Sequence, residues 1–177
     1  IGQGYIQTTP IQLCLMTAQI ANGGYKIYPH LVVDKNDKEQ PLDKFTPLYE
    51  NSKNIRIVQD AMYASTNEVR GTSYRSRIDD IKYQFAGKTG TAQVKKITAK
   101  DRELDLKTFE IPYEERDHAL YVAFGPYKNP RYALSVIVEH GGNGSTTAAP
   151  MAKKLFKQII DRHEIRQSIM DKKYLEI

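Results

Sequence analysis

Residues 83–94 read Tyr-Gln-Phe-Ala-Gly-Lys-Thr-Gly-Thr-Ala-Gln-Val, and this stretch decides how the rest of the chain is interpreted. Its aromatic and β-branched side chains predict a β-strand. Gly87 and Gly90 interrupt the pattern, and glycines inside a strand often mark the close approach of a ligand or of another backbone segment. Lys88 lies between them, next to two threonine hydroxyls. We therefore expect this strand to form an anion-binding edge.

The composition fits one globular domain. The chain has 177 residues, of which 40% are hydrophobic and 27% are charged, which is sufficient for a packed core. The net charge is +5, but acidic and basic residues are interspersed, whereas a nucleic-acid-binding module would concentrate its basic residues in one stripe. The densest basic cluster, Lys95, Lys96 and Lys100, is followed at once by acidic residues and is interpreted as a solvated loop. We expect no nucleic acid partner.

Metal and cofactor chemistry finds no support in the cysteine and histidine positions. His30, His140 and His163 are scattered, with no metal-ligand spacing among them or with Cys14. Cys14 lies in an apolar stretch, where a buried thiol is the expected role. His118 begins a predicted strand and is interpreted as a hydrogen-bonded structural residue. We expect neither a metal site nor a cofactor.

Hydrophobic periodicity and turn residues predict the order of the elements. The expected elements are a helix over 11–22 with Thr8 or Thr9 as its N-cap, a helix over 52–65, the strand above, a hairpin of strands 119–124 and 132–138, and a last helix opened by Thr146 or Thr147 and Pro150. This order predicts an α+β fold in which helices cover an antiparallel β-sheet.

Two of these helices have a predicted inner face. Ser52 is expected to cap the second helix, whose buried residues would be Ile55, Val58 and Met62. The last helix is expected to bury the apolar set Met151, Leu155, Phe156, Ile159 and Ile160. By contrast, helix 11–22 is apolar almost all round, which is typical of a helix inside a larger protein.

Several motifs in this chain occur together in one family. The central one is Gly87-Lys-Thr-Gly-Thr-Ala-Gln93, and around it, in order, stand Gly2-Gln-Gly-Tyr5 with Thr9-Pro-Ile-Gln-Leu13, Asp117-His-Ala119 with Phe124-Gly-Pro126, Glu139-His-Gly-Gly142 and Ala148-Ala-Pro150. The central motif resembles the third active-site motif of penicillin-binding transpeptidases. The set as a whole resembles the class B high-molecular-weight enzymes that act in cell-wall elongation, and it spans nearly the whole chain.

The resemblance implies acyl transfer between peptidoglycan stem peptides, with β-lactams as mimics of the donor peptide. It assigns substrate binding to four residues of the strand. Lys88, Thr89 and Thr91 would bind the donor carboxylate, and the Thr91 N–H would help to stabilise the oxyanion. Gly90 would let the substrate lie against the strand as an added β-strand. The implied partners are stem peptides, β-lactams and, for the parent protein, cell-wall elongation proteins.

Strand alternation sets a condition on this assignment. It places Lys88 and Gly90 on one face of the strand and Thr89 and Thr91 on the other. Both sets can reach one ligand only if the strand lies at the edge of its sheet. The sequence therefore predicts an edge strand.

The catalytic half of the family's site is missing. The family's nucleophile lies in a Ser-x-x-Lys motif, which occurs nowhere in these 177 residues. The second motif has two literal matches, Ser52-Lys-Asn54 and Ser65-Thr-Asn67, but both follow Gly2-Gln-Gly-Tyr5 instead of preceding it. Ser52 and Ser65 are therefore interpreted as a helix cap and a helix end. No catalytic residue is assigned in this chain.

We accordingly expect residues 1–177 to be the C-terminal portion of a transpeptidase domain and to be inactive alone. The parent would be held in the bacterial inner membrane by one anchor outside this chain, with this domain on the periplasmic side. The chain could self-associate through the surface left by the missing part. The alternatives are a serine β-lactamase, which must also activate a deacylating water, and a non-enzymatic β-lactam sensor domain of the same fold.

Overall fold

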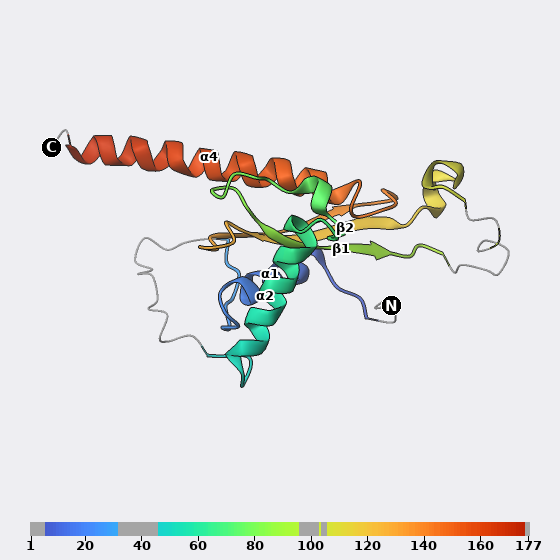
Figure 1. Ribbon diagram of the computed structural model, residues 1–177, viewed down its shortest axis with the longest axis horizontal. Coiled ribbons are helices and arrows are strands. Elements are labelled where there is room, and N and C mark those ends of the chain that lie inside the picture. Colours follow the sequence, from blue (N-terminus) through green and yellow to red (C-terminus); the bar gives the residue numbers. More distant parts are fainter. Residues whose placement is uncertain (1–5, 32–45, 96–102, 104–105, 176–177) are drawn as a thin grey trace.

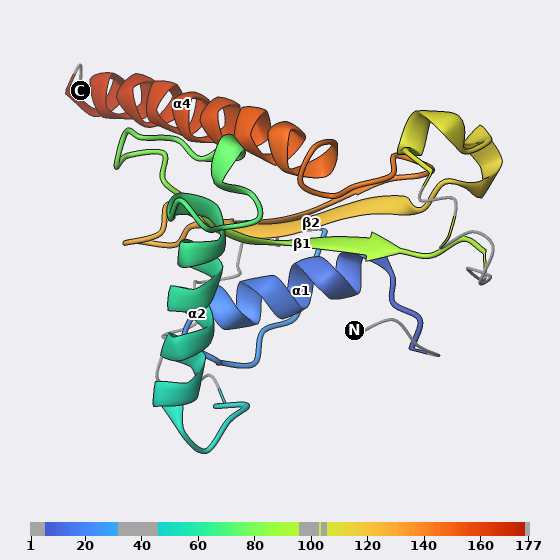
Figure 2. The same ribbon diagram turned by 45° about the vertical axis from the view of Figure 1, so that its right-hand side comes forward.

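The computed structural model describes residues 6–31, 46–95, 103 and 106–175, and it has three layers (Figures 1 and 2). The middle layer is an antiparallel sheet in the order β1-β2-β3, formed by β1 (Ala86–Ala92), β2 (His118–Gly125) and β3 (Tyr132–Val138). Helices α1 (Pro10–Ala21) and α2 (Ser52–Asn67) cover one face, and α4 (Ala148–Leu175) covers the other. The predicted α+β fold and the 119–138 hairpin are confirmed.

Strand β1 lies at the edge of this sheet. It pairs only with β2 among the described residues, with Ala86 opposite Phe124 and Ala92 opposite His118. Strand β2 lies in the middle, because its other side pairs with β3. The opening stretch therefore forms the edge strand that alternation required.

Each face of the sheet has its own hydrophobic cluster. On the α4 face the buried residues include Phe85, Tyr121 and Phe156, and the rings of Phe85 and Phe156 stack with centroids 4.9 Å apart. On the α1 and α2 face Met62, Ala86 and Phe124 are buried. Phe85 and Ala86 thus point to opposite faces, as alternation along a strand requires. The sheet is therefore the centre of the core.

The first helix begins and ends close to the predicted residues. Thr9 is the N-cap of α1, and it forms a capping box with Gln12, while Pro10 occupies the first helical position. After the helix, Gly23 and Gly24 have φ angles of 93° and 92°, a conformation that favours glycine. Local signals therefore explain both ends of α1.

The second helix differs from the prediction at its start and on its buried face. Asn51, not Ser52, is the N-cap, and its side-chain oxygen accepts a hydrogen bond from the Lys53 N–H. The buried residues of α2 are Ile55, Gln59, Met62 and Thr66. Val58, which was expected inside, is 40% exposed. Gln59 lies on the buried face because its side-chain amide donates a hydrogen bond to the carbonyl oxygen of Ile20, near the end of α1, at 2.7 Å.

The two cap residues can be separated by mutation. Asn51→Ala is expected to lower the free energy of unfolding by about 1 kcal/mol, because the Lys53 N–H loses its acceptor. Ser52→Ala, one residue later, should change stability by less than about 0.5 kcal/mol, since Ser52 already lies inside the helix. Urea denaturation monitored by circular dichroism compares the two variants. The reverse order of effects would restore Ser52 as the cap.

The last helix buries only part of the predicted set: Phe156 and Ile160 are buried as expected, and Ile159 is half-buried. Its fully buried residues are Ala148, Ala149, Ala152 and Phe156, and Ile160 is nearly so. Met151 and Leu155 were expected inside but are 45% and 41% exposed. Small alanines lie against the sheet, which lets α4 approach β2 and β3 closely, so the larger side chains of Met151 and Leu155 turn outward.

In the described part of the chain, no helix has both the length and the apolar character needed to cross a membrane.

Candidate functional site

The predicted anion-binding residues meet at the free edge of β1. The exposed Lys88 ammonium donates to the carbonyl oxygen of Thr89 at 2.9 Å and to its hydroxyl at 3.3 Å. Lys88 shares its face of the strand with Ala86, whereas Thr89 shares the opposite face with Phe85. The two side chains reach each other around the rim, which only an edge strand permits. Alternation therefore does not prevent them from binding one ligand.

Hydroxyl groups continue this rim away from the strand. The Thr89 hydroxyl lies 3.4 Å from the Thr72 hydroxyl, which lies 3.3 Å from the Ser65 hydroxyl. Ser65 is part of the last turn of α2, and Thr72 lies in the connection to β1. The rim therefore combines one ammonium group with three hydroxyls, all of which are hydrogen-bond donors suited to an anion.

The other two predicted residues lie further along β1. Gly90 is half-buried, and Thr91 is exposed on the face that Thr89 shares. Gly144, just before α4, packs directly on this part of the sheet. A Cβ atom at position 144 would lie 2.5 Å from the carbonyl oxygen of Gly90 and 2.4 Å from that of Leu120. The backbone around Gly90 is therefore held closely from the α4 side.

A buried cluster of hydroxyls lies next to the first residues of β1. Nothing in the sequence indicated it. The Tyr121 hydroxyl lies 2.9 Å from the Thr66 hydroxyl and 3.0 Å from the Ser73 hydroxyl. Thr66 also donates to the carbonyl oxygen of Gly87 at 3.5 Å. A Cβ atom on Gly87 would lie 2.4 Å from the Tyr121 hydroxyl oxygen, so glycine is required there. The cluster links α2, the following segment and β2 to the residue that precedes Lys88.

Burial raises the pKa of the Tyr121 hydroxyl above its usual value of 10, because desolvation disfavours the phenolate. The hydroxyls of Thr66 and Ser73 oppose this effect only in part. Tyr121 is therefore a neutral hydrogen-bonding residue at physiological pH.

Removing this hydroxyl should destabilise the fold. Tyr121→Phe is expected to lower the free energy of unfolding by about 1–2 kcal/mol, because Thr66 and Ser73 lose a shared partner in a buried site. Tyr132→Phe is the matched control, since the half-buried Tyr132 hydroxyl makes no hydrogen bond with the described residues. Chemical denaturation measures both variants. Equal losses would mean that the Tyr121 cluster contributes nothing specific.

The histidines and the cysteine take structural positions. The His140 N–H donates to His118 Nδ1 at 2.9 Å, which agrees with a structural role for His118. The Cys14 thiol contacts the carbonyl oxygen of Ala133 at 3.5 Å, and burial raises its pKa. Among the described residues, no group of three or more His, Cys, Asp or Glu could hold a metal ion.

Residues 1–161 match the family model described as "Penicillin binding protein transpeptidase domain". The chain belongs to this family. The penicillin-binding transpeptidase motif Gly87-Lys-Thr-Gly-Thr-Ala-Gln93 is thus on β1 and just beyond it. The motif Gly2-Gln-Gly-Tyr5 lies outside the described residues, and Ser52 opens α2.

Curated relatives of this penicillin-binding transpeptidase chain are named as peptidoglycan D,D-transpeptidases. "Peptidoglycan D,D-transpeptidase MrdA" of Salmonella typhimurium (strain SL1344) is 34% identical over 173 residues, which cover 91% of this chain and 26% of the relative. The protein of the same name from Escherichia coli (strain K12) is 32% identical over 166 residues, with 91% and 25% covered. The chain thus spans about a quarter of the length of these curated relatives.

Solved structures agree. Penicillin-binding protein 2 (PBP2) of Helicobacter pylori, in a complex with MreC, superimposes with a TM-score of 0.70 at 31% identity, covering 91% of this chain and 26% of that one. Pseudomonas aeruginosa PBP2, in complex with WCK 5153, gives a TM-score of 0.67 at 36% identity, with 89% and 32% covered. The predicted resemblance to class B penicillin-binding proteins is confirmed, and both of these solved relatives are PBP2.

Proposed function

We propose that this chain is the C-terminal portion of a peptidoglycan D,D-transpeptidase of cell-wall elongation, and that β1 binds the donor peptide in it. The observation that carries the proposal is the contact of Lys88 with Thr89 around a free strand edge, inside the family's motif. The relatives named above are peptidoglycan D,D-transpeptidases, which supports the reaction class.

In this proposal the strand works as a carboxylate clamp. The Lys88 ammonium and the hydroxyls of Thr89 and Thr91 bind the terminal carboxylate of the donor peptide, or the carboxylate of a β-lactam that mimics it. Lys88 already contacts the Thr89 carbonyl and hydroxyl, so the ammonium is held near the position it needs. Little side-chain ordering then remains for the binding step.

The rest of β1 serves the reacting carbonyl. The donor lies along the strand as an added β-strand, and Gly90 allows its close approach because no side chain stands in the way. The Thr91 N–H and the N–H of the nucleophilic serine would stabilise the oxyanion of the tetrahedral intermediate. The serine and its lysine are supplied by the part of the parent outside residues 1–177, since no Ser-x-x-Lys occurs here.

The chain has exposed apolar surface that a further part of the domain could cover. Ile11 and Met16 on α1, and Met151 and Leu155 on α4, are exposed. Strand β3 pairs only with β2 in the described part of the chain, and the buried Ser135 hydroxyl has no hydrogen-bond partner there. The remainder of the domain would cover these groups, and in the isolated chain a second copy could replace it.

A fluorescent penicillin tests the proposal. The 177-residue chain should form no covalent adduct, whereas the parent should form one that a Ser→Ala change in its Ser-x-x-Lys motif abolishes. An adduct on the isolated chain would mean that residues 1–177 do contain a nucleophile. A parent without that motif would exclude transpeptidation. Rapid turnover of the penicillin by the parent would favour a serine β-lactamase, and an adduct without cross-linking of stem peptides would favour a sensor domain.

The proposed location follows from the reaction. A peptidoglycan cross-linking domain has to lie on the outer side of the inner membrane, so we expect one membrane anchor in the parent outside this chain. One solved relative is a complex of PBP2 with MreC, and we propose that the parent likewise binds elongation proteins. Membrane fractionation of the tagged parent tests the anchor. Recovery in the soluble fraction would contradict it.

A further inference from the structure

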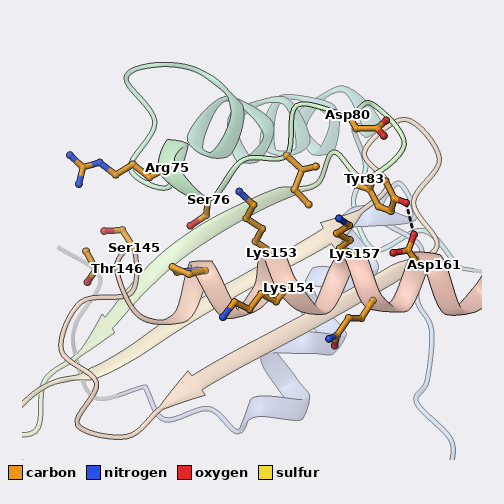
Figure 3. A pocket seen from close by; sticks show the side chains of 13 residues that line it. Arg75, Ser76, Asp80, Tyr83, Ser145, Thr146, Lys153, Lys154, Lys157 and Asp161 are labelled. Atoms are coloured by element: carbon orange, nitrogen blue, oxygen red, sulfur yellow. Dashed lines mark hydrogen bonds between the residues drawn. The ribbon is translucent and has the colours of Figure 1, made fainter.

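A cavity of about 910 Å³ lies between α4 and the segment that precedes β1 (Figure 3). One wall is the segment between α2 and β1, which contributes Arg75, Ser76 and Ile78. The other wall is the first half of α4, with Pro150 and Lys153 among the lining residues. Its volume lies in the range of cavities that bind small molecules. The proposed transpeptidase chemistry does not use this cavity.

The cavity has an excess of positive charge. Its lining cations are Arg75, Lys153, Lys154 and Lys157. None of the four forms an ion pair with another described residue. Three lysines within two turns of one helix repel one another, and an anion between them and the opposite wall would relieve this repulsion.

The two lining carboxylates are engaged at the other end of the cavity. Asp161 accepts a hydrogen bond from the Tyr83 hydroxyl (Figure 3), and Asp80 accepts one from the Lys82 N–H at 3.0 Å. The two carboxylates keep their charge, so the lining holds four cations against two anions.

Ser76 contributes a hydroxyl to the lining of the cavity. Its side chain lines the cavity but is only 2% exposed, and its hydroxyl makes no hydrogen bond within the described part of the chain. The Ser76 oxygen is not among the fully buried atoms that lack a partner, so the space that it reaches is the cavity, where a ligand can hydrogen-bond to it. Figure 3 shows the Lys153 side chain rising from α4 towards the segment that carries Ser76. The hydroxyl and the ammonium thus border the same space.

We infer that this cavity binds an anionic ligand with an apolar body. The Ser76 hydroxyl and the Lys153 ammonium donate hydrogen bonds to its carboxylate or phosphate group, and Lys157 adds charge. Ile78 and Pro150 contact the apolar body. The site is separate from the proposed carboxylate clamp, because Lys88 and Thr89 are not among its lining residues.

Two amphipathic anions test the inference, 3-phenylpropionate for the carboxylate and 3-phenylpropyl phosphate for the phosphate. Each is titrated at constant ionic strength into the ¹⁵N-labelled chain, and calorimetry repeats the comparison on the parent protein. We expect saturable shifts of the Ser76 and Lys153 amides, with the tighter of the two ligands identifying the anionic group. Inorganic phosphate should bind at least about tenfold more weakly than the phenylpropyl phosphate, because it lacks the apolar body.

Matched variants decide where the ligand binds. Lys153→Gln should weaken binding about tenfold and Ser76→Ala about fivefold, because each removes a hydrogen bond to a charged group. Lys128→Gln, on the exposed hairpin turn, should leave the dissociation constant unchanged. Equal affinities of the Lys153→Gln and Lys128→Gln variants, or shifts that do not saturate, would overturn the site. Loss of binding in Lys88→Gln alone would assign the ligand to β1 instead.

Discussion

Replacing Lys88 by Gln in the parent protein should lower the second-order rate constant of acylation by a β-lactam about 10- to 100-fold. The amide cannot supply the charge-assisted hydrogen bond to the carboxylate, which contributes about 1.5–3 kcal/mol. Stopped-flow measurement of acylation gives the rate constant. The fold should be retained, because the Lys88 side chain is exposed and, among the described residues, hydrogen-bonds only with Thr89.

Two further variants show whether the effect belongs to this site. Lys128→Gln changes an exposed lysine by the same chemistry at the hairpin turn and should acylate at the wild-type rate. For a β-lactam whose carboxylate is esterified, Lys88→Gln should lower the rate constant of acylation only slightly, since the ester has no anionic group for Lys88 to bind. If the ester and the free acid lost rate equally, Lys88 would not be the carboxylate ligand.

Phe156→Ala should have the largest effect on stability. Phe156 is fully buried on the inner face of α4 and stacks on Phe85, with the ring centroids 4.9 Å apart. Truncation leaves a cavity between α4 and the sheet, so the free energy of unfolding should fall by about 3–5 kcal/mol. Urea denaturation, or thermal unfolding if the variant is only marginally stable, measures the loss.

The control for this variant is on the opposite face of the same helix. Met151→Ala should cost less than about 1 kcal/mol, because Met151 is 45% exposed. This comparison also tests which face of α4 lies against the sheet, since the hydrophobic pattern placed both residues inside. A loss at Met151 as large as that at Phe156 would mean that α4 is rotated relative to the structure described above.

The strands and the first helix could be predicted because their signals are local. Thr9, Pro10 and the glycine pair after Asn22 define the ends of α1 by cap chemistry that acts within a few residues. The 118–138 hairpin combines two apolar β-branched runs with a turn rich in proline. In these places the chain neighbours alone decide the conformation.

The buried faces of α2 and α4 could be predicted only in part: Ile55, Met62, Phe156 and Ile160 are buried as expected, and tertiary contacts decide the rest. Gln59 and Thr66 are polar, yet they are buried because each finds a hydrogen-bond acceptor on a neighbouring element or on its own helix. On α4 the alanines carry little hydrophobic signal, but Ala149 and Ala152 allow the close contact with the sheet. A pattern that ranks residues by hydrophobicity favours the larger Leu155 instead.

The motif indicated Lys88 and Thr89, whereas the groups that surround them escaped sequence analysis. The Tyr121 cluster joins residues 48 and 55 positions apart in sequence, and a hydroxyl in an apolar strand gives no sign of such partners. The cavity at Ser76 and Lys153 likewise exists only because the segment before β1 passes over α4. Both features depend on the crossing of distant segments.

The free edge of β1 also has a consequence for aggregation. A strand edge that must stay open for a peptide to pair with it cannot be covered by a helix or loop, so it is equally open to a strand from another molecule. A lysine on an edge strand opposes such pairing, because a neighbouring strand would have to desolvate its charge. Lys88 would then select what may pair with β1: a chain end that carries a carboxylate is accepted, and an uncharged strand is rejected.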